Sequence, residues 1–221
     1  MKKNKINLKD MPKEIPVFPL PNAIFFPKTV LPLNIFEPRY KQMTEDALKQ
    51  NKYIGMAQPN IQIIDQKKPV IFKVGCLGII ENYTETKDGR CLINLKGLTR
   101  FKIIKEIDNA KLYRTFQVSY DDFSNDLVET DSEVKQQNLL ELIEKTKKFF
   151  KMFQLSTDWK IVEKVEPNQL INSLSMICPF TSGEKQRLLE TTTLEERNNI
   201  LSQIINFYIL SDQSNQKKNI H

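Results

Sequence analysis

The pattern of hydrophobic and polar positions changes character near the middle of the chain. From Ile15 to Tyr120 the apolar residues come in short runs, some alternating with polar neighbours and interrupted by prolines and glycines. Such runs are typical of strands, because successive side chains on a strand point to opposite faces. From about Ser132 the apolar residues recur at helical spacing. The sequence therefore predicts an α+β protein, with a β-rich first half and a helical second half.

Prolines constrain the first expected strands. Proline cannot donate to a sheet ladder, so residues 16–21 and 30–35 are expected in short or edge strands and turns. Pro38 suits the first position of a helix, which should end near Asn51. The helical spacing places Tyr40, Met43, Ala47 and Leu48 on one face of this helix. The remaining expected features are strands at 53–57, 75–83, 91–95, 100–104 and 114–120, a turn at Asp88-Gly89 and a bulge or bend at Gly97.

The second half contains helical stretches with recognisable start and stop signals. A long amphipathic helix carries Phe149 and Phe150, and a later one should stop at Pro179. Capping boxes open two further helices, Thr181 with Glu184 and Thr193 with Glu196. The organisation we expect is a disordered basic tail at 1–11, a β-rich domain at 12–123, a linker at 124–131, a helical bundle at 132–211 and a disordered tail at 212–221.

Composition excludes several kinds of chemistry. The 221 residues include one histidine, His221 at the chain end, so a catalytic site or metal site built on an interior imidazole is not expected. Cys76, Cys91 and Cys178 are widely spaced and suggest neither disulfides nor a zinc site. No apolar run reaches the roughly 20 residues that span a bilayer, and no signal peptide is apparent. We expect a cytoplasmic protein with no enzymatic activity, no metal, no cofactor and no membrane partner.

A set of short motifs occurs in one order along most of the chain. Each motif is common by itself, and the specificity lies in their order from about residue 15 to 210. The motifs are Pro16-Val17-Phe18-Pro19-Leu20, Phe26-Pro27, Leu31-Pro32-Leu33, Ile35-Phe36-Glu37-Pro38-Arg39-Tyr40, Val74-Gly75-Cys76-Leu77-Gly78, Asp88-Gly89-Arg90, Lys96-Gly97 with Arg100-Phe101, and Glu184-Lys185-Gln186-Arg187-Leu188-Leu189-Glu190.

This ordered set resembles the N-terminal, substrate-binding domain family of Lon proteases. The resemblance implies a PUA-like pseudo-barrel β-domain followed by a C-terminal α-helical bundle. A Lon protease continues into an AAA+ ATPase and a peptidase, but the chain has no G-x-x-x-x-G-K-[ST] motif to cradle phosphates. We therefore expect a stand-alone module that recognises proteins and does not cleave them.

The expected function is binding of unfolded or specific polypeptide segments, in association with a protease or chaperone. Alternatives are an RNA or other nucleic-acid-binding module, which the net charge of +6 permits, and a small-molecule-binding regulatory protein. The alternative role of Glu37 is a helix cap, and the alternative roles of Arg39 and Arg100 are local ion pairs or hydrogen bonds. For at least one of Phe25 and Phe26 the alternative is core packing, since adjacent strand residues face opposite sides. The candidate polypeptide-binding surface comprises Phe25, Phe26, Ile35, Phe36, Glu37, Arg39, Tyr40 and Arg100.

Overall fold

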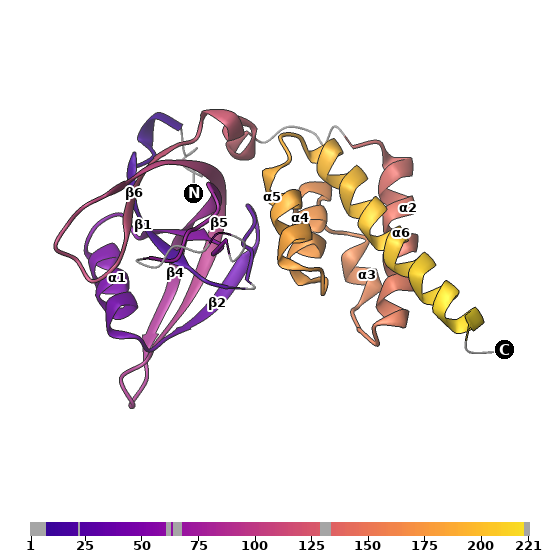
Figure 1. The fold of residues 1–221 in the computed structure, drawn as a ribbon, viewed down its shortest axis with the longest axis horizontal. Helices are drawn as coiled ribbons and strands as arrows, with labels where there is room; N and C mark the ends of the chain where they lie inside the picture. The colour runs from indigo at the N-terminus through magenta and orange to yellow at the C-terminus, as the bar shows by residue number, and fades with distance from the viewer. Residues whose placement is uncertain (1–7, 22, 61–62, 64–67, 129–133, 219–221) are drawn as a thin grey trace. The chain divides into compact units, whose positions relative to one another are not determined.

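The computed structural model describes residues 8–21, 23–60, 63, 68–128 and 134–218 (Figure 1). The chain forms two compact units, each described below by itself. The first comprises Met1–Glu129 together with Phe180–Glu190, and the second comprises Thr130–Pro179 together with Thr191–His221. Residues 1–7 of the expected basic tail, 129–131 of the expected linker, 132–133 of the expected bundle and 219–221 of the expected C-terminal tail lie outside the described residues.

Six strands of the first unit form one mixed sheet. They are β1 (Glu14–Pro19), β2 (Val30–Ile35), β3 (Tyr53–Ala57), β4 (Val74–Glu85), β5 (Cys91–Ile107) and β6 (Thr115–Ser119). The strand order is β2-β5-β4-β3-β1-β6, and β6 also pairs with β5. Strands β5, β4, β3, β1 and β6 therefore close into a ring, while β2 is attached to the side of β5 and leaves its other edge unpaired within the described chain (Figure 1).

The expected turn and bulge both occur. Gly89 has a φ of +75° in the turn between β4 and β5, a value that glycine adopts without strain. On β5 the pairing skips a residue, because Thr99 faces Leu77 whereas Gly97 faces Gly78. A Cβ atom on Gly97 would lie 2.1 Å from the Phe26 carbonyl oxygen, so the close approach of these two backbones requires glycine.

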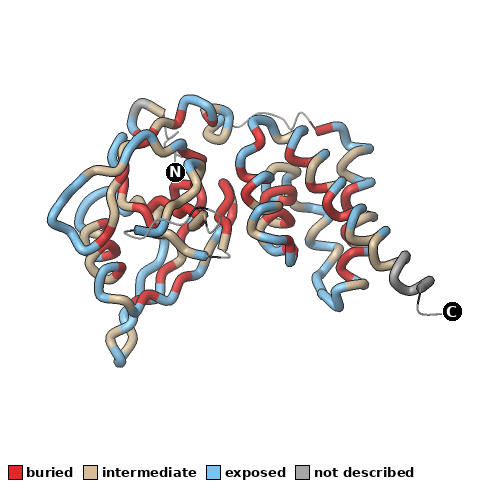
Figure 2. The backbone as a smooth tube through the Cα atoms, viewed as in Figure 1, coloured by how far each residue is buried: buried red, intermediate tan, exposed pale blue. Residues whose placement is uncertain are grey.

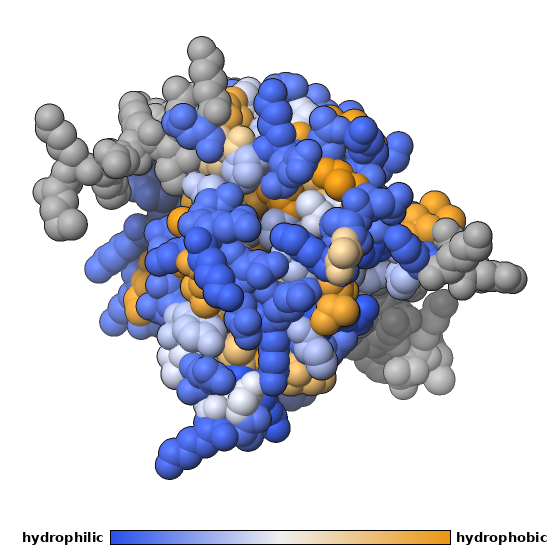
Figure 3. All heavy atoms as spheres, turned by 90° about the vertical axis from the view of Figure 1, so that its left-hand side faces the viewer, coloured by the Kyte–Doolittle hydropathy of each residue, from blue (hydrophilic) through white to orange (hydrophobic). Residues whose placement is uncertain are grey.

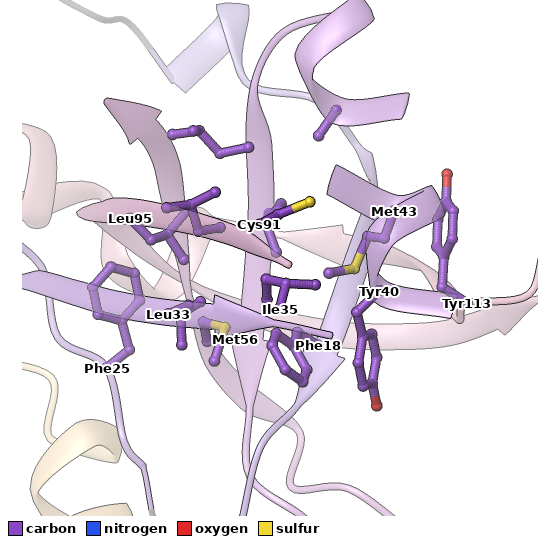
Figure 4. Packing of buried hydrophobic residues seen from close by; sticks show 14 of the residues in the cluster. Phe18, Phe25, Leu33, Ile35, Tyr40, Met43, Met56, Cys91, Leu95 and Tyr113 are labelled. Carbon is purple, nitrogen blue, oxygen red and sulfur yellow. The ribbon is translucent and has the colours of Figure 1, made fainter. Parts of the chain in front are cut away.

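Two apolar clusters hold the first unit together. Every strand of the ring contributes to one of them, which contains Ile15, Val17, Ala57, Leu77, Phe101, Phe116 and Val118. The other joins β2 and the helix α1 (Pro38–Lys49) to the sheet through Leu33, Ile35, Tyr40, Met43, Met56 and Leu95, among others (Figure 4). The helix presents Tyr40, Met43, Thr44 and Ala47 to this cluster, which is the face that the sequence spacing predicts.

Short helical segments complete the first unit. They are η1 (Leu8–Asp10), η2 (Asp121–Leu127) and α5 (Ser182–Glu190). η1 and the buried Met11 fall in the expected basic tail, and part of η2 falls in the expected linker. The helix α5 lies in the range expected for the bundle, yet its contacts group it with the β-rich unit.

The second unit is helical, and aromatic side chains join its elements. It contains α2 (Gln136–Met152), α3 (Trp159–Val162), α4 (Pro167–Ile177) and α6 (Leu194–Lys218), so α6 continues past residue 211. The ring centres of Phe149 in α2 and Tyr208 in α6 are 5.8 Å apart, and those of Phe150 in α2 and Trp159 in α3 are 5.3 Å apart. The expected α+β class is confirmed.

Candidate functional site

Five of the eight residues expected to form a polypeptide-binding surface are buried. Phe25, Phe26, Ile35, Tyr40 and Arg100 are at most 5% exposed. Figure 2 colours the buried residues red along the tube of the β-rich unit. Side chains in the interior cannot contact a partner in this conformation. The expected surface therefore narrows to Phe36, Glu37 and Arg39.

Both Phe25 and Phe26 are interior residues because the segment is irregular. Residues 23–26 form neither helix nor strand, so the two side chains are not forced to opposite faces. Phe25 packs in the cluster with α1 and β2, and the Phe26 carbonyl accepts a hydrogen bond from the Thr29 hydroxyl at 2.7 Å. Core packing, the alternative considered from the sequence, is the observed role of both phenylalanines.

The Arg100 side chain links several elements inside the first unit by hydrogen bonds. Its Nε and Nη2 atoms donate to the two Asp126 carboxylate oxygens at 2.9 and 2.8 Å, and its backbone N–H also donates to Asp126 at 2.9 Å. Nη1 donates to the Leu189 carbonyl at 3.0 Å, and the guanidinium carbon lies 4.4 Å from the centre of the Phe123 ring. The arginine therefore ties β5, η2 and α5 together, which accounts for its burial.

The helix α5 is anchored to the sheet by Gln186, which belongs to the Glu184-Lys185-Gln186-Arg187-Leu188-Leu189-Glu190 motif. Gln186 is buried, and its side-chain amide donates to the Val74 carbonyl at the start of β4, at 3.2 Å. The expected capping box opens the helix, since the Thr181 N–H donates to Glu184 at 2.8 Å and the Glu184 N–H donates to the Thr181 hydroxyl at 3.3 Å. The motif thus positions α5 on the β-rich unit.

Phe36 is the exposed apolar residue among the expected ones. It follows β2 directly and is 63% exposed. Two residues later Pro38 begins α1, so the backbone on either side of Phe36 belongs to regular elements. Glu37 and Arg39 flank the helix start and form an ion pair at 2.8 Å on the surface.

Arg39 also lies over a buried aromatic ring. Its guanidinium carbon is 4.5 Å from the centre of the Tyr40 ring. Burial raises the pKa of the Tyr40 phenol, and the positive charge of Arg39 partly offsets this rise. The phenol is therefore neutral at physiological pH, and the charges that remain at this surface are those of Glu37 and Arg39.

Sequence reasoning missed the exposed apolar residues of β2 and β5. Val30 and Pro32 are the exposed alternate residues of β2, and Leu92 of β5, also exposed, faces Asn34 across the strand pair. Diagonal neighbours on one face of a strand pair are within reach of each other, so Leu92 lies beside Pro32. We call Val30, Pro32, Phe36 and Leu92 the Phe36 surface. The strand expected at residues 30–35 was the sequence signal that could have identified them, because alternate residues of a strand face opposite sides.

One face of this unit's surface is largely polar. Figure 3 shows a face of the β-rich unit on which hydrophilic residues predominate and hydrophobic ones occur in small separate groups. Single exposed apolar residues are common on soluble proteins, whereas grouped ones mark contact sites. The exposed apolar residues along 30–36, with Leu92 of the paired strand, are therefore candidates for such a contact site.

A polar cavity lies in the same unit. Its volume is about 150 Å³, and it opens among the C-terminal end of α1, β1 and the start of β6. The Tyr113 hydroxyl donates to Asp46 at 2.8 Å and receives a hydrogen bond from Lys111 at 2.8 Å. The hydrogen bond with Tyr113 and the nearby Asp46 carboxylate raise the pKa of Lys111, which is therefore charged at neutral pH. Burial raises the pKa of Tyr113, and the phenol stays neutral.

Other site chemistry is limited in the described residues. No group of three or more His, Cys, Asp or Glu side chains there could hold a metal ion. The side chains of Cys76, Cys91 and Cys178 are buried. Among the helices that the structure describes, none combines the length and apolar character needed to cross a membrane.

Comparison with known proteins identifies the family. The model of the ATP-dependent protease La (LON) substrate-binding domain matches residues 14–206. Lon protease from Dictyoglomus thermophilum is 25% identical over 198 residues, which are 89% of this chain and 25% of that protein. Lon protease from Bacillus thuringiensis is 27% identical over 194 residues, 86% of this chain and 24% of the relative. The chain thus spans about a quarter of the length of the curated relatives it matches.

Solved structures show the same fold. The Lon N-terminal domain protein from Xanthomonas campestris aligns with a TM-score of 0.60 and 19% identity, covering 85% of this chain and 96% of that one. The N-terminal domain of Mycobacterium avium complex Lon protease aligns with a TM-score of 0.62 and 18% identity, covering 88% and 98%. The family match over residues 14–206 shows that the chain belongs to the LON substrate-binding domain family.

Proposed function

We propose that the chain binds unfolded or specific polypeptide segments through the Phe36 surface and does not cleave them. The observation that carries the proposal is the 63% exposure of Phe36 at the junction of β2 and α1. An aromatic side chain held between two regular elements costs little conformational entropy to immobilise further, which makes it a suitable anchor. Membership of a substrate-binding domain family supports the same role.

The size of the surface favours weak, broad recognition. Burying the exposed part of one phenylalanine contributes roughly 2–3 kcal/mol, and three smaller apolar neighbours add to it. Unfolded segments expose such apolar side chains, whereas folded proteins bury most of them. The Glu37–Arg39 pair at the rim adds polar contacts but little affinity. We expect micromolar affinity for unfolded polypeptides.

The edge of β2 is less suited to adding a peptide strand. Pro32 lies in the middle of β2 and faces Asn94 of β5. A proline has no N–H to offer a new strand, and prolines on edges hinder strand addition. The proposal therefore places the contact on the side chains of this surface and not on its backbone.

Nucleic-acid binding receives less support from the charges. Lys68, Lys96, Lys102 and Arg114 each lie within 3.2 Å of a carboxylate oxygen. Neighbouring carboxylates reduce the attraction of a basic surface for phosphates. We further propose that the protein acts in the cytoplasm, in association with a protease or chaperone.

A binding assay with an unfolded model protein tests the proposal. The probe is fluorescently labelled lactalbumin, reduced and carboxymethylated so that it stays unfolded, with the native folded form as comparison. We expect Phe36→Ser to weaken binding about tenfold or more, because 1.4 kcal/mol corresponds to a factor of ten. Ile104→Ser is the matched control, since Ile104 is 59% exposed near the other end of β5. Equal affinity of the two variants, or no preference for the unfolded form, contradicts the proposal.

A further inference from the structure

We propose that the polar cavity beside α1 binds a cationic side chain, arginine or lysine, of a polypeptide held at the Phe36 surface. The inference rests on the proposed function and names a chemical preference within it. It follows from the size of the cavity, the charges of its lining and its position along α1.

The volume of the cavity limits what can occupy it. About 150 Å³ is below the range of roughly 300–1,000 Å³ that holds drug-sized ligands and nucleotides. It is comparable to a single long side chain. Ile15, Ala47 and Pro12 contribute apolar wall to the cavity, which suits the methylene stem of an arginine or lysine.

The charges of the lining favour a cation. Glu14, Asp46 and Lys111 are the charged side chains that line the cavity. Asp46 and Lys111 lie 3.5 Å apart and compensate each other, with Tyr113 hydrogen-bonded between them. In the described part of the chain, the Glu14 carboxylate has no arginine or lysine within ion-pair distance. One negative charge is therefore left for a ligand.

Neutral polar groups around Glu14 can serve the same ligand. The side chains of Gln50, Tyr53 and Thr115 also line the cavity, and each carries an oxygen that can accept a hydrogen bond. A guanidinium or ammonium group is a donor only, so it matches a lining that combines one free carboxylate with several acceptors. An anionic side chain would instead be repelled by the Glu14 carboxylate.

The cavity and the Phe36 surface lie at opposite ends of α1. Phe36 precedes the helix, whereas Asp46, Ala47 and Gln50 belong to its last turn or follow it. Twelve helical residues rise about 18 Å, which is the length of five or six residues in an extended chain. A single extended segment can thus contact both sites when an apolar residue and a basic residue are about six positions apart.

Two labelled peptides of twelve residues test the inference by fluorescence anisotropy. Both carry a phenylalanine, and six positions later one has arginine and the other has citrulline, which is neutral and nearly the same shape. We expect the wild-type chain to bind the arginine peptide about fivefold more tightly, the magnitude of a partly exposed charged hydrogen bond. Glu14→Gln should abolish this preference and leave the affinity for the citrulline peptide unchanged. Glu45→Gln, at an exposed carboxylate of α1 outside the cavity lining, should keep the preference.

The outcomes separate this inference from the proposed function. Phe36→Ser should weaken both peptides and preserve their ratio. Equal affinities for arginine and citrulline in the wild-type chain, with the Phe36 dependence intact, overturn the cavity inference alone. A preference that survives Glu14→Gln also overturns it. Absence of binding by either peptide overturns both proposals.

Discussion

The ion pair of Arg100 with Asp126 gives the sharpest stability prediction. The two side chains are 3% and 9% exposed, and two hydrogen bonds join them at 2.9 and 2.8 Å. Asp126→Asn removes the negative charge with little change of shape. The buried Arg100 cation then lacks the carboxylate that pairs with it. Breaking a buried ion pair by removing one partner costs about 3–5 kcal/mol.

A neighbouring pair provides the matched control. Lys102 of β5 and Asp122 of η2 also pair at 2.9 Å, but their side chains are 53% and 52% exposed. Exposed pairs contribute about 0–1 kcal/mol. Asp122→Asn should therefore have little effect, although it removes the same kind of charge between the same two elements.

Urea unfolding of the first unit measures the difference. Five of the six tyrosines lie in that unit, so near-ultraviolet circular dichroism of tyrosine follows it, while Trp159 fluorescence follows the second unit. With a slope of about 2 kcal/mol per molar urea, Asp126→Asn should lower the tyrosine midpoint by about 2 M. Arg100→Met combined with Asp126→Leu should recover most of the loss. Equal midpoints for Asp126→Asn and Asp122→Asn would refute the reasoning.

Three further changes have defined outcomes. Gly97→Ala should destabilise the first unit by about 1–3 kcal/mol in the same urea assay, because its Cβ would lie 2.1 Å from the Phe26 carbonyl oxygen. Thr181→Ala should cost about 1 kcal/mol by removing the cap of α5. The hydrogen bond from Arg114 lowers the pKa of Glu106, so this carboxylate stabilises the folded state above its ordinary pKa and the contribution is lost as pH falls through the lowered value. As the pH falls below about 4.5, the Glu106→Gln variant should therefore lose less stability than the wild type. The difference between the two losses should be less than about 1 kcal/mol, because the Arg114–Glu106 pair is partly exposed.

Each of these three changes has its own control. Gly183→Ala is the comparison for Gly97, since nothing lies within 4 Å of a Cβ at Gly183, and equal destabilisation would contradict the close-approach argument. Thr181→Ser retains a capping hydroxyl and should unfold near the wild-type midpoint. For Glu106, the stabilities of the variant and the wild type, measured from pH 3 to 7, should differ mainly at the neutral end and converge as the pH falls. A constant offset across that range would show that the titration is not responsible.

Local patterns predicted many of the regular elements, although η1 and part of η2 fall in the expected tail and linker and the strands expected at 91–95 and 100–104 are one strand, β5. The spacing around Pro38 predicts α1 and its buried face, and residues 53–57 coincide with β3. Asp88-Gly89 and Gly97 mark the turn and bulge that the structure contains. These features depend on a few neighbouring residues, which is why they can be recognised without knowing the tertiary structure.

Residues whose surroundings come from distant parts of the chain were harder to interpret. Arg100 meets Asp126 and Leu189, which are 26 and 89 positions away in sequence, and nothing local indicates that pairing. Phe25 and Phe26 do not alternate because their segment is irregular. Long-range contacts of this kind determine burial, and burial decided which of the expected surface residues remain accessible.

Photo-cross-linking tests the central claim most directly. A benzophenone amino acid at position 36 reacts with whatever lies against it, and the same amino acid at position 104 provides the control. With an unfolded polypeptide present, the account predicts strong cross-linking from position 36 and little from position 104, the two exposed positions compared. Equal yields from the two positions, or no cross-link from position 36, would contradict the claim that the Phe36 surface binds polypeptides.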